Sequence, residues 1–241
     1  MIVNQIKRMI PTLKVNNRNL NELFYIETLG MKPLLEESAF LSLGDQSGIE
    51  KLVLEESPSM RSRKVEGIKK LARLLVKVEN ASEIEALLAR MEKLPQLYKG
   101  NKGYAFEILS PEGDLVLIHA EDDIKDLRKF DETVTFTKDE KVQYLTAFDI
   151  SAEINLPAET TSLLEKEEIE TSITFKQAQG SDLLVENNVT WDLSMLKFQV
   201  KELELASLRQ RFETAGYFIP KSEKFFLTKD ANNIELWFEE V

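Results

Sequence analysis

The sequence predicts an α+β fold made of four copies of one βαβββ unit, the third of them eroded. The first observation is a strand followed by an amphipathic helix, a pattern that occurs in Leu74–Leu94 and again in Leu196–Phe218. The second observation is that a hairpin of two apolar segments around a turn follows each copy. The hairpins comprise Tyr104–Ile108 with Leu115–His119, around SPEG, and Phe225–Thr228 with Ile234–Phe238, around KDANN.

The predicted helices carry start and stop signals. Ser82 and Glu85 have the spacing of a capping box, which satisfies two backbone N–H groups at a helix start. Gly216 is expected to end the helix of the last unit, because glycine readily adopts the left-handed conformation found there. The N-terminal region repeats the pattern with a strand ending at Val15, a helix near Leu20–Leu29 that ends at Gly30, and strands near Ala39–Leu43 and Lys51–Glu55.

The third unit is the least complete. Strands are predicted within Tyr144–Pro157 and Glu170–Gln179, and the sequence AETTSLLEKEEI between them is the only candidate for its helix. Charge also divides the chain, because residues 1–120 hold 17 basic and 16 acidic side chains, whereas residues 121–241 hold 14 and 26. We therefore predict an N-terminal domain over residues 1–122, a polar linker over 123–141 and a C-terminal domain over 142–241.

The composition excludes several classes of function. The chain has no cysteine, which removes disulfides, thiolate catalysis and cysteine metal sites. Its net charge of -11 argues against nucleic acid as a partner. No apolar run is long enough to span a membrane. The N-terminus carries Lys7 and Arg8 where a signal peptide has its apolar core, so we expect a cytoplasmic protein without a cleaved signal.

Three stretches resemble the vicinal oxygen chelate superfamily, which includes glyoxalase I and extradiol dioxygenases: Leu13–Lys32, Leu52–Ser59 and Phe106–Ile118. The resemblance implies two domains of that kind, each built from paired βαβββ modules. It also implies a U-shaped sheet around a divalent metal, with one ligand from each of four inward-facing strands.

Strand alternation places those four ligand positions in this chain. They fall on Ile10, near Glu55, on Arg73 and on Leu117. Only Glu55 has a side chain able to bind a metal, because isoleucine and leucine have no donor atoms and arginine is a cation. In the second domain Glu235 fits the fourth position, but its partner position falls near Met195. We therefore expect no metal, no cofactor, and neither glyoxalase nor dioxygenase chemistry.

The same alternation predicts a ligand-binding cavity. Arg73, at a former metal position, could pair with Glu55 and replace the charge of the metal. Lys14 and Lys77 are expected to face the same space, which would suit a small anionic ligand. The alternative is a structural ion pair that closes the cavity. His119, the only histidine, lies on the same face, either as a general base or as an ordinary strand-end residue.

Over nearly its whole length the sequence resembles the streptococcal CppA family, which is described as complement C3-degrading proteinases. The resemblance implies complement C3 as a partner and exposure at the cell surface. A serine protease triad would have to combine His119 with a serine such as Ser59 or Ser110, and neither serine lies in a nucleophile elbow. The alternative is a binding module for a small anion or a protein partner, with a homodimer among the options.

The aromatic residues of the second domain allow two interpretations. They are expected to belong to its core, although a few of them could form a partner-binding patch instead. The residues in question are Trp191, Trp237, Phe225 and Phe226.

Overall fold

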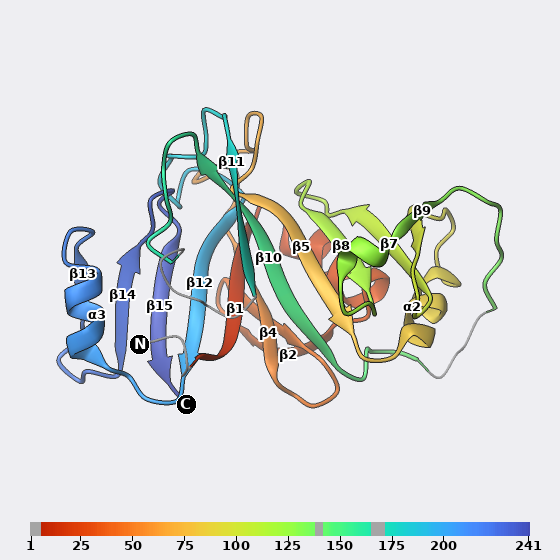
Figure 1. The fold of residues 1–241 in the computed structure, drawn as a ribbon, viewed down its shortest axis with the longest axis horizontal. Coiled ribbons are helices and arrows are strands. Elements are labelled where there is room, and N and C mark those ends of the chain that lie inside the picture. The colour runs from red at the N-terminus through yellow and green to blue at the C-terminus, as the bar shows by residue number, and fades with distance from the viewer. Residues whose placement is uncertain (1–5, 138–141, 165–171) are drawn as a thin grey trace.

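The chain forms two large mixed sheets (Figure 1), and a computed structural model describes residues 6–137, 142–164 and 172–241. One sheet has eight strands in the order β13-β14-β15-β12-β1-β4-β3-β2, and the other has seven in the order β11-β10-β5-β8-β7-β6-β9. In the described part of the chain no helix is both long and apolar enough to cross a membrane.

The first βαβββ module lies at the N-terminus. It comprises β1 (Ile6–Val15), α1 (Arg18–Glu22), the π-helical η2 (Leu23–Thr28), β2 (Lys32–Glu37), β3 (Phe40–Gly44) and β4 (Glu50–Glu56). The side chain of Asn17 caps α1 by accepting a hydrogen bond from the N–H of Leu20. Gly30 follows the helical segment with φ +71°, as the sequence predicts.

The second module has the same order of elements. It comprises β5 (Leu71–Val78), α2 (Ala81–Leu88), β6 (Gln96–Lys99), β7 (Tyr104–Leu109) and β8 (Leu115–His119). The predicted capping box is wrong, because Asn80 is the cap and its side chain accepts from the N–H of Ser82. Within the predicted linker lie a short 3-10 helix, η3 (Ile124–Asp126), and the strand β9 (Arg128–Phe130), which pairs with β6. Residues 138–141 of that linker lie outside the described part.

In the described residues the third module comprises two parallel strands, β10 (Phe148–Pro157) and β11 (Ile173–Ala178). Its candidate helix was placed on residues 158–169. Residues 158–164 form turns and irregular structure, and the remainder of that candidate lies outside the described residues.

The fourth module is complete. It comprises β12 (Leu193–Val200), α3 (Leu205–Arg211), β13 (Tyr217–Phe218), β14 (Phe225–Lys229) and β15 (Glu235–Glu240). Gly216 does not end α3, because that helix already ends before Phe212; Gly216 has φ +71° in the turn before β13 instead. Phe226 is fully buried in the core, whereas Phe225 and Trp237 stack at 3.8 Å on the opposite face of the sheet.

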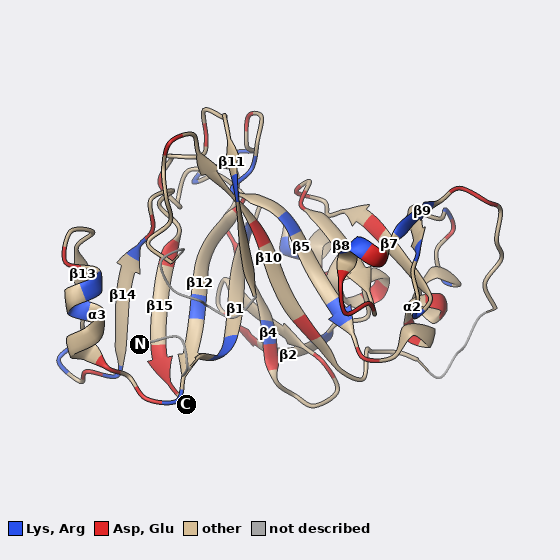
Figure 2. Ribbon diagram, viewed as in Figure 1, with Lys and Arg blue, Asp and Glu red and all other residues tan. Residues whose placement is uncertain are grey.

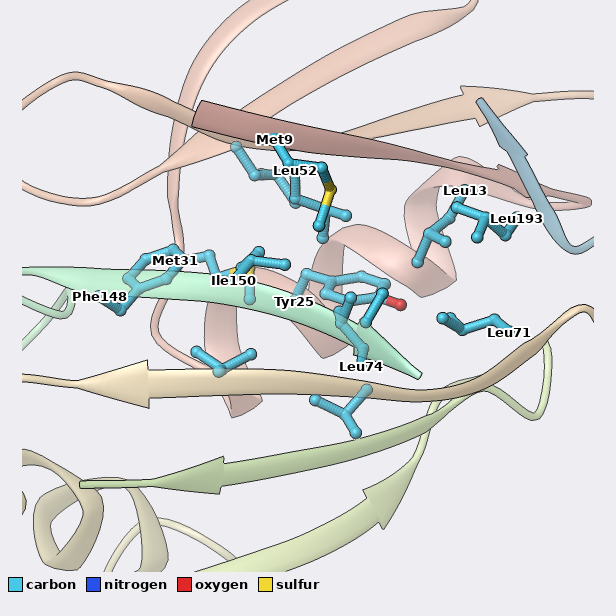
Figure 3. Packing of buried hydrophobic residues seen from close by; sticks show 14 of the residues in the cluster. Met9, Leu13, Tyr25, Met31, Leu52, Leu71, Leu74, Phe148, Ile150 and Leu193 are labelled. Carbon is cyan, nitrogen blue, oxygen red and sulfur yellow. The ribbon is translucent and has the colours of Figure 1, made fainter. Parts of the chain in front are cut away.

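The modules combine across the two predicted domains. β1 pairs with β12 in antiparallel fashion, which joins the first module to the fourth. β5 pairs with β10, also antiparallel, which joins the second module to the third. Apolar side chains of both sheets then meet in one core with the helical segment of the first module (Figure 3); Leu13, Leu52, Tyr25, Leu74 and Ile150 all belong to it. Burial of this continuous apolar surface is the main source of stability.

Asp192 fixes the junction between the two sheets. Its buried carboxylate accepts the backbone N–H of Lys70 at 2.6 Å and that of Leu71 at 3.1 Å, where β5 begins. It also accepts the N–H of Leu193 at 2.8 Å, where β12 begins. Burial raises the pKa of Asp192 to about 6. The Asp192 side chain therefore accepts hydrogen bonds from backbone N–H groups at the starts of β5 and β12, which belong to different sheets.

We expect the substitution Asp192→Ala to destabilise the protein by roughly 3 kcal/mol or more, because three N–H groups lose their acceptor at about 1–3 kcal/mol each when buried. Urea unfolding measures the loss. Asp131→Ala is the control, because the Asp131 side chain is 71% exposed and surface changes of this kind cost less than about 0.5 kcal/mol. Equal midpoints for the two variants would contradict this role of Asp192.

Candidate functional site

The four predicted ligand positions do not meet in one site. Ile10 and Glu55 lie on β1 and β4 of the eight-stranded sheet, whereas Arg73 and Leu117 lie on β5 and β8 of the seven-stranded sheet. The prediction assumed that the first two modules share one U-shaped sheet. The observed strand pairing instead gives each sheet one module from each half of the chain.

The predicted pairing of Arg73 with Glu55 is consequently wrong. Glu55 pairs with Lys14, its cross-strand neighbour, at 3.1 Å. Arg73 donates to both carboxylate oxygens of Glu153, with Nε–Oε2 at 3.0 Å and Nη2–Oε1 at 2.8 Å. Its other amino group reaches Glu107 at 3.3 Å. Both pairs are cross-strand contacts within a single sheet.

The former ligand positions do not fit a divalent metal. Ile10 and Leu117 offer no donor atom, and the guanidinium of Arg73 is held by two carboxylates. Glu235 on β15 lies opposite Met195 in the sheet register. Among the residues that the structure describes, no group of three or more histidine or acidic side chains is arranged to hold a metal ion.

A cavity of about 580 Å³ opens where the two sheets cross. Residues of β1, β4, β5, β10 and β11 line it, together with His119 and the segment 122–124 that follows β8. Of the predicted site residues, Lys77 and His119 line this cavity, and Arg73, Glu55 and Lys14 do not. Figure 2 shows the basic segments of β1, β4 and β5 that border the crossing.

Basic side chains outnumber acidic ones on the cavity wall. Four of them are basic, Lys7, Arg8, Lys51 and Lys77, and three are acidic, Asp122, Asp123 and Asp149. With a neutral histidine the local formal charge is +4 − 3 = +1, against -11 for the whole chain. The cavity wall therefore has a small positive formal charge in a chain that is acidic overall.

The acidic groups of the cavity are already engaged. Asp122 accepts from Lys77 and from Lys102, at 2.8 Å each. Hydrogen bonds from Lys102 and Lys77 lower the pKa of Asp122 to about 2. Asp149 pairs with Lys51 at 2.8 Å, and Asp123 caps η3 by accepting from the N–H of Lys125. Asp122 and Asp149 are thus held by lysine side chains, and Asp123 is held by a backbone N–H.

His119 is the polar group of the cavity whose bonding is incomplete. The residue is 4% exposed, and its Nδ1 has no hydrogen-bond partner among the residues that the structure describes. Burial, together with the nearby charge of Lys77, lowers its pKa to about 4. The imidazole is therefore neutral at pH 7, and its unpaired Nδ1 is itself buried. A buried polar atom of this kind marks a site that needs explanation.

The serines proposed for a triad are elsewhere. Ser110 donates to Asp114 at 2.9 Å, at the end of the β7–β8 hairpin opposite His119. Ser59 is exposed in the turn after β4. The serines that line the cavity with His119 are Ser151 and Ser172. The structure therefore does not bring together the combination considered from sequence.

Lys7, Arg8 and Lys51 are cavity residues that the sequence analysis did not assign to a site. Lys7 and Arg8 were noted only because they interrupt a signal-peptide pattern. Lys51 lies at a register shift between β3 and β4. Its side chain therefore need not follow the regular alternation of faces along the strand. The only sequence signal for these cavity residues is the basic pair Lys7 and Arg8 at the start of a predicted strand. That pair does not indicate which other strands lie beside it.

The chain has the fold of glyoxalase- and dioxygenase-like vicinal oxygen chelate proteins. A proposed dioxygenase from Bacillus subtilis aligns with a TM-score of 0.62 at 14% identity, covering 98% of this chain and 86% of the other. Glyoxalase I from Zea mays aligns with a TM-score of 0.55 at 9% identity, covering 98% and 93%. Identities this low show a shared fold alone.

Two family matches and one solved structure make the assignment more specific. Residues 8–130 match the CppA N-terminal family, and residues 145–238 match the CppA C-terminal family. The crystal structure of cppA protein from Streptococcus pneumoniae TIGR4 aligns with a TM-score of 0.94 at 66% identity, covering 99% of this chain and 100% of that one. The chain belongs to the CppA family. A comparison with curated proteins finds no match.

His119 should make stability fall in acid. The unfolded histidine takes up a proton near pH 6.5, whereas the folded one does so near pH 4, so the free energy of unfolding decreases as the pH falls through that window. The shift corresponds to about 3 kcal/mol. Lys77 and Arg73 oppose protonation in the fold and Glu121 favours it. Urea unfolding from pH 7 to pH 4 should show a smaller loss for His119→Gln than for the wild type; parallel profiles would contradict this.

A double-mutant cycle should separate the observed ion pair from the predicted one. Arg73→Met and Glu153→Gln should show a coupling energy of about 1–3 kcal/mol, because their side chains are in direct contact. Arg73→Met and Glu55→Gln should be additive within about 0.5 kcal/mol, because Glu55 lies in the other sheet. Unfolding free energies of the single and double variants give both values. Coupling to Glu55 alone would contradict the observed arrangement.

Proposed function

We propose that the chain is a binding module whose cavity at the sheet crossing takes a small anionic ligand. The observation that carries the proposal is the buried His119, whose Nδ1 lacks a partner in a cavity with four basic side chains. Ligand sites are concave, with a few convergent polar groups and perturbed pKa values. The cavity lies on the face of the sheet that carries the former ligand positions Arg73 and Leu117.

The residues suggest how such a ligand would be held. Lys77 is 42% exposed and pairs with Asp122, which is 74% exposed, so an arriving anion can displace that carboxylate at little cost. Neutral His119 would contribute one directional hydrogen bond, without a second charge, once a ring rotation turns its buried Nδ1 toward the cavity. Leu75 and Ile150 supply apolar wall beside these groups. Binding that depends on exposed basic side chains should weaken as the salt concentration rises.

Degradation of complement C3 is the activity that the family resemblance implies, and a serine mechanism would need a nucleophile bonded to His119, whose Nδ1 has no partner among the described residues. His119 is the only histidine available as a general base. Incubation of C3 with purified full-length chain, beside His119→Ala, tests this reading. Cleavage by the wild type and none by a folded variant would overturn the binding-module proposal in favour of catalysis.

Ligand binding should appear as stabilisation by anions. With inorganic phosphate and succinate as probes, we expect a concentration-dependent rise in melting temperature; at a hundred times Kd the gain is about 2.7 kcal/mol. Lys77→Gln and His119→Gln should reduce the rise. Lys129→Gln is the matched control, because the Lys129 side chain is 59% exposed on β9 and lies outside the cavity wall. An equal response in all four proteins would place any binding outside this cavity.

A further inference from the structure

The reduced third module leaves a strand position open beside β11. In each complete module the last strand is parallel to the first, and its other side pairs with an antiparallel strand: β4 with β3, β8 with β7, and β15 with β14. β11 is parallel to β10 and takes the place of that last strand. In the described parts of the chain no strand pairs with its other side, so β11 is the last strand in the order of the seven-stranded sheet.

The hydrogen bonds to β10 show which backbone groups remain at this edge. The N–H of Ala152 donates to the carbonyl of Ser172 at 2.7 Å, and Ala152 is the register partner of Ile173. Because backbone groups of successive strand residues point to opposite sides, Thr174 and Lys176 face β10. Ile173, Phe175 and Gln177 then direct their N–H and carbonyl groups away from it, where they form a regular pairing edge.

β11 has few of the features, such as proline or several charged side chains, that keep strand edges from pairing with other chains. It is six residues long and contains no proline. Its one charge, Lys176, is held by Glu153 at 2.7 Å within the same sheet. Ile173 and Phe175 pack partly against the main core. Uncovered strands of this kind are templates for pairing with another chain.

We propose that β11 of a second copy of this chain pairs antiparallel with β11, so that two seven-stranded sheets join across a two-fold axis. The outward groups allow one register in which all three residues pair. Phe175 then lies opposite its own copy, and Ile173 opposite Gln177. Each pair exchanges two backbone hydrogen bonds. A two-fold interface of this kind closes on itself and leaves no further edge at that position.

The side chains are self-complementary in this register. On the core side the two Phe175 rings meet as a cross-strand aromatic pair, which is a stabilising combination. On the other side Lys176 lies opposite Thr174 of the copy, so no like charges are directly opposed. Each Lys176 also keeps its own Glu153. An arbitrary extended peptide would supply the backbone bonds without this match, and we therefore favour a second copy.

Because the chain has no cysteine, single cysteines can test the register directly. Thr174 and the copy's Lys176 form a non-hydrogen-bonded pair, whose Cα atoms are about 4.5 Å apart, within disulfide reach. A mixture of Thr174→Cys and Lys176→Cys should form a disulfide-linked dimer under mild oxidation. Each variant alone should cross-link much less. Equal cross-linking of the separate variants and the mixture, or none in any sample, would overturn the proposal.

A proline variant provides a second test that leaves the fold intact. The N–H of Gln177 points outward, so Gln177→Pro removes one edge donor while the hydrogen bonds to β10 remain. Sedimentation velocity over a wide concentration range should show a monomer–dimer equilibrium for the wild type and for the control Gln177→Ala, and a shift to monomer for Gln177→Pro. A wild type that stays monomeric throughout, or a proline variant that dimerises equally, would refute pairing through β11.

Discussion

The antiparallel pairing of β1 with β12 and of β5 with β10 is the constraint on which the rest of the structure depends. Each contact joins a module from the first half of the chain to one from the second half. Both sheets therefore contain residues from both halves, and Asp192 ties their strand starts together through three backbone hydrogen bonds. The helical segment of the first module is enclosed in the core between them. The two family regions consequently form one interlocked structure.

This pairing also decides which polar side chains can act together. Arg73, beside β10, has Glu153 as its cross-strand partner, and the pair is part of an ion network within one sheet. The cavity forms at the crossing itself, where Lys7 and Arg8 of β1 lie across from Lys77 and His119. His119 has a lowered pKa and, among the described residues, a buried Nδ1 without a hydrogen-bond partner, and we propose it as the residue that contacts the ligand. The proposed site is thus lined by residues of both sheets, and the former metal-ligand positions lie outside its wall.

Local features of the fold were accessible from sequence, and nonlocal ones were not. Apolar alternation and turn residues correctly indicated the hairpin ending at His119 and the helix stop at Gly30. Alternation also gave the face of Arg73, Leu75 and Lys77. Which strands become neighbours depends on contacts between distant segments of the chain. The predicted ion pair between Glu55 and Arg73 was wrong because the two residues lie in different sheets. Asn80 displaced Ser82 as the cap because competing cap residues lay two positions apart, and periodicity does not rank them.

The most direct test of the central claim follows the imidazole of His119 by NMR, because a single histidine gives unambiguous signals. Inorganic phosphate or succinate would be titrated into the full-length protein at pH 7, with Lys77→Gln as the comparison. An anion bound at the sheet crossing should cause saturable shifts of the imidazole resonances, and these shifts should weaken in the variant. Imidazole signals that do not change, while other resonances report binding elsewhere, would contradict an anion site at the sheet crossing.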